Sequence, residues 1–525
     1  MKRTIRMMIS AVLIFTARFV TAEITLEQLG TYSAGIFNGS AAEIAAYDPA
    51  TQRLFVANGA QARIDVLDIS NPESPSLHAS IDVTPYGADP TSVDVYNGMV
   101  AVAIVAEAKT DAGTVALFDA DGMPLTHVAV GALPDMLAFT PNGKKIIVAN
   151  EGEPSDDYTV DPEGSISIIN LSRGLRRISV ETAHFRRYNG KEDRLREKGV
   201  RIFGPNASAA QDFEPEYITV SDDSRTAYVT LQENNAIAVV DIKQARVTDI
   251  IPLGFKQHLF WRNAFDASDR DNTINIRPWQ VRGMYLPDGI ASYTAYGKTF
   301  LITANEGDSR DYDGFSEEER VEDITLHPYF LSLYPDIQEK ENLGRLKTTA
   351  FPPSGKTTAS DGTDVFHHIY SFGARSFSIW TEDGRLVYDS GSEFEEITAS
   401  FFPANFNSNN EENNSFDNRS DDKGPEPENV VLGVINGHTY AFIGLERMGG
   451  IMIYDVTNPF TPHFSDYVTN RNFDGNPEEG TAGGLAPEGI LFIPANQSPT
   501  GVPLLVVSNE VSGTTTLYAV IEPYN

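Results

Sequence analysis

The chain of 525 residues contains no cysteine. This absence excludes disulfide bonds, thiolate metal sites, a cysteine nucleophile and a lipidated cysteine anchor. Long apolar runs are also missing after residue 22, whereas a membrane-spanning helix needs about 20 consecutive apolar residues. We therefore expect no transmembrane span in the mature protein.

Basic residues are scarce. Lys and Arg total 40 against 73 Asp and Glu, a formal net charge of −33. The first 22 residues hold four of these bases and no acid, so 36 bases face 73 acids in the rest, a net charge of −37. Such a surplus argues against nucleic acid or an anionic membrane as a direct partner and favours cations or solubility. Hydrophobic residues make up 41% of the chain, which is typical of a folded protein.

Signatures of common catalytic nucleophiles are missing as well. The sequence has no Gly-x-Ser-x-Gly turn, no His-Glu-x-x-His helix and no phosphate-binding Gly-x-x-x-x-Gly-Lys loop. If the protein is an enzyme, the class that remains is hydrolysis by metal-activated water with carboxylate ligands.

The first 22 residues have the pattern of a secretory signal peptide. Lys2, Arg3 and Arg6 precede an apolar stretch at residues 7–16, and small residues lead up to Ala22. This order is typical of a signal that is cleaved after Ala22. An uncleaved anchor or a wrong start assignment is the alternative. The pattern predicts a secreted or periplasmic protein.

The remaining chain repeats two phrases. The first, an acid at the start of a strand, occurs at Pro134-Asp135, Pro215-Glu216, Pro287-Asp288, Pro427-Glu428 and Pro487-Glu488, with weaker copies at Ala42-Glu43 and Pro90-Thr91. The second closes the following β-branched run and reads Asn150-Glu151, Gln232-Glu233, Asn305-Glu306, Leu445-Glu446 and Asn509-Glu510, with Glu107 and Asn58 at the weaker copies. After it comes a turn and another strand-length apolar run.

Seven repeats of an antiparallel unit of three or four strands predict an all-β fold, a seven-bladed β-propeller. We expect residues 23–525 to form one such domain. A solenoid is the alternative, although solenoid repeats are usually shorter and more regular. Residues 26–37, ahead of the first repeat, resemble a spare strand that would complete the seventh blade beside residues 514–520 and hide its open edge.

Long insertions interrupt the repeats at about 174–213, 254–286, 307–370 and 403–425. We expect a helix at residues 191–198 and a short helix at 316–322. The insertion 403–425 is rich in Asn and Asp with little apolar content, which predicts a mobile loop.

The acids of the two phrases are predicted to share one face. The first strand of a blade leaves this face and the second returns to it, so both acids emerge beside the channel opening. The predicted metal ligands are Glu43, Asp135, Glu216, Asp288, Glu428, Glu488, Glu151, Glu233, Glu306, Glu446 and Glu510. Crowded carboxylates raise one another's pKa unless a cation neutralises them, and Ca²⁺ accepts six to eight oxygen ligands.

Two alternatives to a metal site stay open. Acids near strand ends often accept hydrogen bonds from turn amides of their own segment. Arginines close to these phrases in sequence, namely Arg310, Arg375 and Arg447, could also neutralise them.

Several longer strings carry a family resemblance. They are the segments 149–156 (ANEGEPSD), 204–211 (GPNASAAQ), 266–271 (DASDRD), 304–310 (ANEGDSR), 427–430 (PENV) and 446–451 (ERMGGI). These resemble the choice-of-anchor I family, which is similar to mesenchyme-specific cell-surface glycoproteins associated with biomineralisation. Bacterial relatives are sometimes labelled alkaline phosphatases. The resemblance implies a seven-bladed propeller, an extracytoplasmic location and calcium binding, but no agreed catalytic residue.

Three functional hypotheses follow. The first is a secreted propeller that binds divalent cations, with calcium the expected ion, and acts as a binding or surface-associated protein. The second is a calcium-dependent, alkaline phosphatase-like phosphoesterase in which bound ions activate water. The third is a lectin-like or protein-binding propeller without metal. Expected partners are divalent cations and either phosphate esters or surface and matrix components. No sorting tail is visible before Asn525, which favours a periplasmic or released product.

Overall fold

The computed structural model describes residues 23–522. The expected signal peptide and its cleavage after Ala22 lie outside these residues.

Seven four-stranded antiparallel sheets dominate the described part of the chain. Their strands are β2–β5 (Ala45–Asp48, Arg53–Asn58, Arg63–Asp68, Ser76–Asp82), β6–β9 (Pro90–Tyr96, Met99–Ile104, Ala112–Asp119, Pro124–Ala132), β10–β13 (Pro134–Phe139, Lys145–Asn150, Ser165–Asn170, Ser179–His184), and β14–β17 (Pro215–Val220, Thr226–Leu231, Ala236–Asp241, Arg246–Pro252). The other three are β20, β21, β30 and β31 (Ile290–Ala295, Lys298–Ala304, Phe377–Thr381, Leu386–Asp389), β32–β35 (Pro427–Ile435, His438–Leu445, Ile451–Asp455, His463–Val468), and β36–β38 with β1 (Pro487–Ile493, Leu504–Asn509, Thr514–Ile521, Thr25–Ser33).

The seven sheets are arranged in a closed circle. The first strand of each sheet contacts the first strand of the next, in the order β2, β6, β10, β14, β20, β32, β36 and back to β2. Antiparallel sheets arranged radially around a common axis define a β-propeller. The predicted all-β propeller fold is therefore confirmed.

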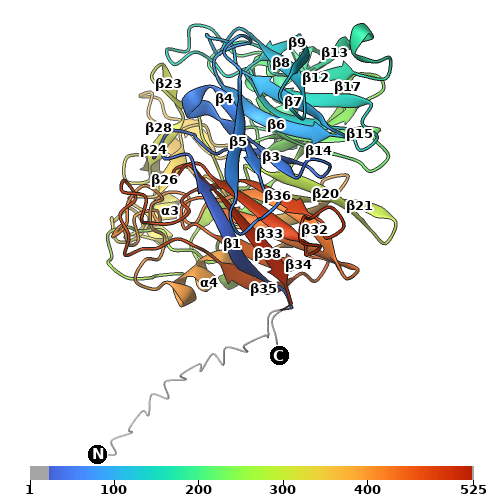
Figure 1. Ribbon diagram of the computed structural model, residues 1–525. Coiled ribbons are helices and arrows are strands. Elements are labelled where there is room, and N and C mark those ends of the chain that lie inside the picture. The colour runs from blue at the N-terminus through green and yellow to red at the C-terminus, as the bar shows by residue number, and fades with distance from the viewer. Residues whose placement is uncertain (1–22, 523–525) are drawn as a thin grey trace, which may run out of the picture.

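The last sheet joins the two ends of the described chain. β1 pairs antiparallel with β38, from Thr25 opposite Ile521 to Ser33 opposite Thr514 (Figure 1). The spare N-terminal strand predicted from the sequence is thus confirmed. Because β1 covers β38, the last sheet does not end on an unpaired C-terminal strand that could pair with another chain.

The apolar core lies between neighbouring sheets. Ile147 of β11 and Ile168 of β12, for example, belong to the same buried cluster as Val229 of β15 and Ala238 of β16 in the next sheet. Strands packed on both faces carry near-continuous apolar runs rather than an alternating pattern. This explains why the second strands, such as β11, have such runs.

The insertions add short strands and four α-helices within residues 23–522. The strands are β18 (Phe255–Gln257), β19 (Val281–Met284), β22 (Asp311–Tyr312), β23 (Phe315–Ser316), β24 (Glu318–Arg320), β25 (Thr325–Leu326), β26 (Lys347–Thr349), β27 (Lys356–Thr358), β28 (Asp364–Phe366) and β29 (Ile369–Ser371). The helices are α1 (Glu192–Lys198), α2 (Ala209–Asp212), α3 (Pro328–Leu333) and α4 (Glu393–Phe401). The structure contains no helix in this range that is long and apolar enough to cross a membrane.

Two predictions about the helices have different outcomes. The helix predicted at 191–198 is confirmed as α1. The helix predicted at 316–322 is wrong, because this segment ends β23 and forms β24, which pairs with β26. The buried Glu317 between these strands forms an ion pair with Arg201 and accepts a hydrogen bond from Thr349 Oγ1 at 2.5 Å. These tertiary contacts override the helical propensity of a glutamate-rich run.

The prediction of a mobile loop at 403–425 is also wrong, since much of this insertion is buried. Asn407 Nδ2 donates to Ser420 Oγ at 2.9 Å, and Arg375 Nη2 donates to the carbonyls of Ser420 and Asp422 at 2.8 and 2.7 Å. Low apolar content therefore did not imply exposure here, because the polar groups satisfy one another.

Candidate functional site

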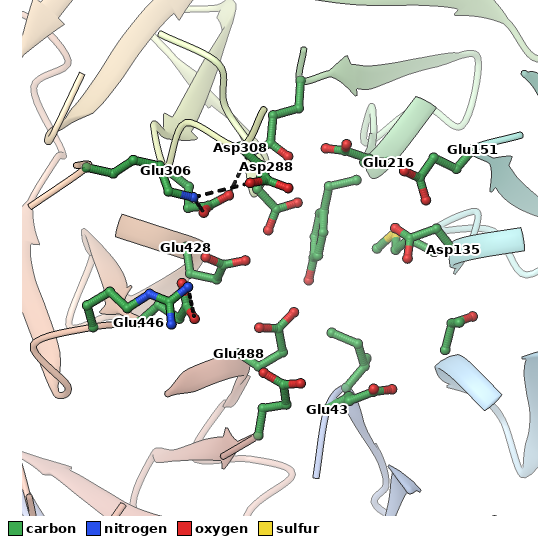
Figure 2. Close-up of a pocket in the computed structure, with 18 residues that line it drawn as sticks. Glu43, Asp135, Glu151, Glu216, Asp288, Glu306, Asp308, Glu428, Glu446 and Glu488 are labelled. Atoms are coloured by element: carbon green, nitrogen blue, oxygen red, sulfur yellow. Dashed lines mark hydrogen bonds and ion pairs between the residues drawn. The ribbon is translucent and has the colours of Figure 1, made fainter. Parts of the chain in front are cut away.

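A cavity of about 370 Å³ lies where the first strands of the sheets begin, and we call it the central cavity. Figure 2 shows side chains from different sheets pointing into this shared space. The acidic residues that line it are Glu43, Asp135, Glu151, Glu216, Asp288, Glu306, Asp308, Glu428, Glu446, Glu488 and Glu510. Among the described residues, Lys423 and Arg447 are the basic side chains that line it.

A β-bulge positions the first acid in four of the five clear repeats. In β10, Pro134 pairs with Asn150 but the regular register resumes only at Leu137, so Asp135 falls in the irregular step. The same step follows Pro215, Pro427 and Pro487. A bulge redirects the side chains of its extra residue, and here it turns the acid toward the cavity. The recurring Pro-acid phrase is the sequence signal for this geometry.

The residue before the proline adopts a left-handed backbone in several repeats. The φ angles are 45° at Leu133, 42° at Leu286, 52° at Glu426 and 59° at Ala486. Such a conformation is costly for residues other than glycine, and it persists only where surrounding contacts hold it. Because the left-handed conformation recurs at corresponding positions, it is a regular feature of the repeat at this face.

The two phrases of a repeat are hydrogen-bonded to each other. The amide of Glu151 donates to the carbonyl of Leu133 at 2.8 Å. The amides of Glu446 and Glu510 donate in the same way to Glu426 and Ala486, both at 2.8 Å. The acid that closes the second strand is thereby held beside the acid that opens the first.

The asparagine of the second phrase has a structural role. Asn150 Nδ2 donates to Ser167 Oγ at 3.0 Å, and Asn305 Nδ2 donates to Ser378 Oγ at 2.9 Å. These bonds connect the second strand to the third within a sheet. They hold the end of the second strand in place, and thus the glutamate that follows.

Ten of the eleven predicted ligands line the central cavity. The exception is Glu233, which is buried but does not line it. Burial raises the pKa of Glu233 to about 7 in spite of the nearby Arg310. Its neighbour Gln232 lines the cavity instead and donates to Glu306 Oε2 at 2.7 Å. Glu107, in a weaker repeat, is exposed and also lies outside the lining.

The three candidate arginines have different partners. Arg310 is buried and pairs with Asp212 at 3.2 Å and Glu214 at 2.9 Å. Arg375 pairs with Glu395 at 2.6 Å. Neither lines the central cavity. Only Arg447 of the three does, and its guanidinium lies 3.3 Å from Glu446 and 3.2 Å from Glu426.

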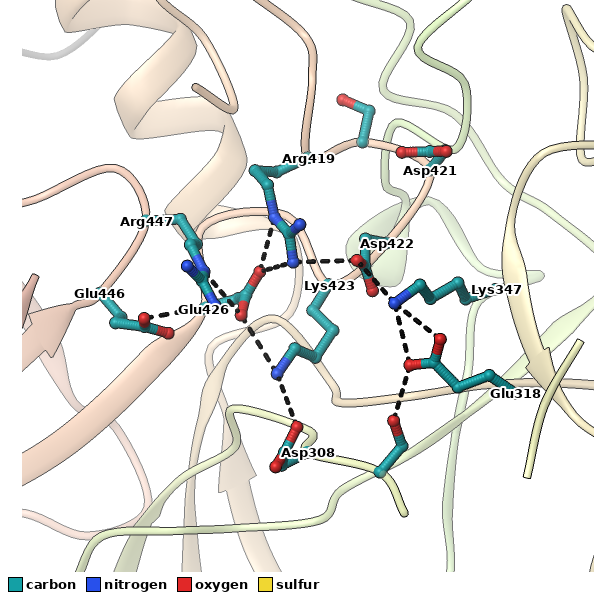
Figure 3. Close-up of polar contacts among 12 residues, drawn as sticks. Asp308, Glu318, Lys347, Arg419, Asp421, Asp422, Lys423, Glu426, Glu446 and Arg447 are labelled. Carbon is teal, nitrogen blue, oxygen red and sulfur yellow. Dashed lines mark hydrogen bonds and ion pairs between the residues drawn. The ribbon is translucent and has the colours of Figure 1, made fainter. Parts of the chain in front are cut away.

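Lys423 from the insertion 403–425 is the other cation at the cavity (Figure 3). Its Nζ pairs with Glu306, with Glu426 at 3.1 Å and with Asp308 at 3.4 Å. Burial alone would raise the pKa of Glu426, but Lys423 and two arginines hold it well below its usual range. Most of the positive charge is therefore directed at Glu426, which lies outside the cavity lining.

The remaining carboxylates are less well neutralised. Burial, followed by repulsion from Glu153, raises the pKa of Asp135 to about 6. Burial and the neighbouring acids Glu426 and Glu306 raise the pKa of Glu446 to about 8, although Arg447 opposes this. Burial is also the main cause of pKa values well above the usual range at Glu43, Glu151, Glu216, Asp288, Glu428 and Glu488.

Few of these acids have a hydrogen-bond partner. Within residues 23–522, none of the ten predicted ligands that line the cavity accepts a hydrogen bond from a backbone N–H. Glu216 and Glu428 are only 7% and 8% exposed, and Oε2 of each has no hydrogen-bond partner in the part of the chain that the structure describes. The alternative in which these acids satisfy turn amides is therefore not what the structure contains.

Three of the carboxylates converge most closely. One oxygen from each of Glu306, Glu428 and Glu446 lies within 4.8 Å of the other two. Two oxygens bound to the same Ca²⁺ at 2.3–2.6 Å can lie up to about 5 Å apart. The spacing of the trio therefore fits hard-cation ligands.

Sequence reasoning missed several residues of the site. Asp308 lies two residues after Glu306, and its acidic character within the Asn-Glu-Gly-Asp string was the available signal. Lys423 had none, because nothing in its local sequence indicates that it reaches the cavity. Gln232 belongs to the second repeated phrase, but Glu233 beside it was the predicted ligand. The positions of Lys423 and Gln232 depend on how a distant insertion and an atypical repeat pack.

Comparison with known proteins identifies the family of this chain. Residues 43–459 match the Choice-of-anchor I domain. This protein belongs to the choice-of-anchor I family. The resemblance seen in the sequence strings is thus confirmed, and the match covers most of the ring of sheets.

The choice-of-anchor I protein is similar to two animal proteins. It is 35% identical over 197 residues to Gigasin-3a of Magallana gigas, which covers 35% of this chain and 67% of the relative. It is 27% identical over 345 residues to the Mesenchyme-specific cell surface glycoprotein of Strongylocentrotus purpuratus, covering 57% of this chain and 43% of the relative. The chain therefore spans less than half the length of that glycoprotein.

Solved structures similar to this chain include hydrazine synthase of Kuenenia stuttgartiensis, which gives a TM-score of 0.46 and 13% identity. That match covers 94% of this chain and 100% of the other. The WD40 domain of coronin from Toxoplasma gondii gives a TM-score of 0.46 and 10% identity, and covers 96% of this chain and 88% of that one.

Proposed function

We propose that this choice-of-anchor I protein is an exported, surface-associated β-propeller that binds divalent cations, with calcium as the ion, in its central cavity. One relative is a cell surface glycoprotein by name, which supports the surface association. The signal-like pattern of residues 1–22 supports export to the periplasm or the medium.

The observation that carries the cation proposal is the unpaired state of buried carboxylates. Glu216 and Glu428 each bury an oxygen without a hydrogen-bond partner, and both line the central cavity. A buried acceptor without a partner costs about 1–3 kcal/mol, and more when it is charged. A cation in the cavity would remove this cost for several carboxylates at once.

The balance of charge at the cavity favours the same conclusion. Among the described residues, eleven acids and two bases line a space of about 370 Å³, and both bases already pair with glutamates. Carboxylates this crowded repel one another, and the raised pKa values of the group reflect this repulsion as well as burial. Hard cations with oxygen ligands, calcium above all, match a site that consists mainly of carboxylates.

Glu306, Glu428 and Glu446 are the best-placed ligands, because their oxygens already converge. Water and the neighbouring acids would complete the six to eight oxygens that calcium takes. Magnesium would be held less well, since it requires a stricter octahedron at shorter distances.

Thermal unfolding with and without calcium tests the proposal. An ion that binds only the folded state stabilises it by RT ln(1 + [L]/Kd), about 2.7 kcal/mol at 100 times Kd. We expect calcium to raise the Tm relative to a chelator, and Glu428→Gln and Glu216→Gln to weaken this effect. The matched control is Glu478→Gln with Glu479→Gln, which removes two exposed acids that do not line the cavity. An unchanged Tm in millimolar calcium would refute the proposal.

A second candidate, a calcium-dependent phosphoesterase, uses the same cavity. Lys423 and Arg447 line it beside the carboxylates, and such cations can bind phosphoryl oxygens. Bound ions would then activate the attacking water. Assays with p-nitrophenyl phosphate and bis-p-nitrophenyl phosphate in calcium decide this point. Turnover that Glu216→Gln with Glu488→Gln does not lower would exclude the cavity as the active site.

A further inference from the structure

A second cavity, of about 1200 Å³, lies at the outer edge of the propeller, and we call it the rim cavity. Its walls come from β18 and the 3₁₀ helix Trp261–Asn263 in the insertion 254–286, from β31, and from the start of α4. Phe460, in the loop between β34 and β35 of the next sheet, completes it. β31 is the last strand in its sheet order, counted from the inner strand β20. The rim cavity shares no lining residue with the central cavity among the described residues.

Exposed aromatic rings flank the rim cavity. Phe260, Trp261 and Phe460 all line it and are 56%, 73% and 58% exposed. Large apolar side chains gathered at the surface and bordered by polar groups mark interaction sites. The chain has three tryptophans, and the other two, Trp279 and Trp380, are buried. Trp261 is therefore the tryptophan that solvent reaches.

A largely buried tyrosine, whose hydroxyl has no hydrogen-bond partner among the described residues, lines the rim cavity. Tyr285 lines it and is only 3% exposed, yet its hydroxyl forms no hydrogen bond with any residue in the range 23–522. Its ring packs edge-on against Trp380, with 4.9 Å between ring centroids. Burial raises its pKa, and the charged residues that act on it are Asp389 and Arg262, both of which also line the cavity. The hydroxyl is not among the fully buried polar atoms, so a ligand in the cavity can form a hydrogen bond with it.

The charged groups of the rim cavity nearly balance, with two bases, Lys256 and Arg262, against three acids, Asp389, Glu393 and Glu396. Lys256 lies 2.9 Å from Asp389 and donates to two backbone carbonyls, so this pair is neutral as a unit. Glu393 accepts from Tyr454 at 2.8 Å, and Glu396 accepts from Ser392 at 2.7 Å. Neither a strongly anionic nor a strongly cationic ligand has a matching field here, in contrast to the central cavity.

We propose that the rim cavity binds a neutral oligosaccharide. A pyranose ring has a C–H face that packs on the electron-rich face of an aromatic ring, and hydroxyls around its edge that both donate and accept hydrogen bonds. Phe260, Trp261 and Phe460 provide such faces. Tyr285 and the exposed Arg262 and Glu396 provide hydrogen-bonding groups. The volume suits a short chain of sugars rather than a single ring.

Quenching of tryptophan fluorescence by acrylamide tests the proposal, because Trp261 dominates the quencher-accessible emission. The probes are hexasaccharides of β-1,4-N-acetylglucosamine, β-1,4-glucose, β-1,3-glucose and α-1,4-glucose. At least one is expected to protect Trp261 and to give saturable binding by calorimetry. Trp261→Ala should weaken this binding about ten-fold or more, which reflects the loss of a hot-spot aromatic contact.

Tyr285→Phe isolates the hydroxyl, because it keeps the packing of the ring on Trp380 and removes one hydrogen-bonding group. It should weaken saccharide binding about five-fold, in line with a single hydrogen bond, without lowering the Tm. Tyr329→Ala is the control, since Tyr329 is an exposed aromatic residue on α3 outside the lining. Glu428→Gln should bind saccharide normally, so this test does not depend on the cation proposal.

The result that overturns the proposal is the absence of protection by every hexasaccharide at about 10 mM, a concentration that reveals even millimolar binding. Protection of Trp261 by an apolar dye such as anilinonaphthalene sulfonate, with none by any saccharide, overturns it as well and identifies a generic apolar surface. Equal saccharide binding by the wild type and both rim variants would place the sugar elsewhere on the protein.

Discussion

Lys423 and Glu306 form an ion pair at the central cavity, although they are 117 residues apart in sequence. Glu306 closes the second strand of its sheet and belongs to the convergent trio with Glu428 and Glu446. Lys423 belongs to the insertion 403–425, so an insertion places a cation of the protein itself at the proposed ion site. Lys423 and a bound calcium ion would therefore compete for Glu306.

Replacement of this lysine tests the competition. Lys423→Met is expected to raise calcium affinity about ten-fold, because the ion would no longer compete with a tethered ammonium. Without calcium the variant should be less stable than wild type by about 1–3 kcal/mol, since Glu306 loses its counter-charge. Calorimetric titration and thermal unfolding measure the two effects. A calcium affinity that falls or stays the same would show that Lys423 assists the site or is irrelevant to it.

The effect of calcium on stability should depend on pH. The pKa values of Asp135, about 6, and Glu446, about 8, lie above those of an unfolded chain. The folded protein keeps these protons when the unfolded chain releases them, so without calcium its stability falls as pH rises from about 4.5 through these values. Calcium favours the ionised carboxylates and opposes that loss.

We therefore expect the rise in Tm caused by calcium to be small near pH 5 and to grow up to about pH 8. Measurement of Tm in calcium and in chelator across this range checks the prediction, with buffers that do not bind calcium. A calcium effect that is constant over pH, or largest at pH 5, would mean that the ion does not bind through these carboxylates.

Arg375 holds the insertion 403–425 in place. Its guanidinium donates to the carbonyl of Asp266 and to Glu395, both at 2.6 Å, and to the carbonyls of Ser420 and Asp422. Arg375→Met should destabilise the protein by about 3–5 kcal/mol, because Glu395 would stay buried without its cation. Arg375→Lys should also be destabilising, since an ammonium cannot replace the planar fork of donors.

Thermal unfolding and limited proteolysis of the Arg375 variants give separate measures. The insertion should become susceptible to cleavage before the sheets unfold, and calcium affinity should change because Lys423 belongs to the same segment. The control Arg385→Ala removes an exposed arginine and should alter the Tm little. Full resistance of residues 403–425 to protease in Arg375→Met would show that other contacts suffice.

Much of the candidate site was predictable because its determinants are local and repeated. The Pro-acid phrase at Asp135, Glu216, Glu428 and Glu488 encodes a bulge, and the antiparallel return of the chain brings the next acid beside it. Neither step requires knowledge of distant contacts. For this reason ten of the eleven predicted acids lie around one cavity.

The exceptions all depend on distant contacts. Glu233 does not line the cavity in a repeat where Gln232 stands in place of asparagine and contacts Glu306. The run at 316–322 forms strands because Arg201 and Thr349 engage the buried Glu317. Composition could not reveal either partner.

The sequence by itself determined the propeller fold, its closure by β1 and the concentration of acids at one face, because strand periodicity and repeated turns act over short distances. Only the tertiary structure decided which acids stay unpaired and which meet a cation. Lys423 and Arg447 reach the cavity through the folding of an insertion and the packing of one loop. The electrostatics of a buried carboxylate depend on every charge near it in space, and the order of residues along the chain does not specify those distances.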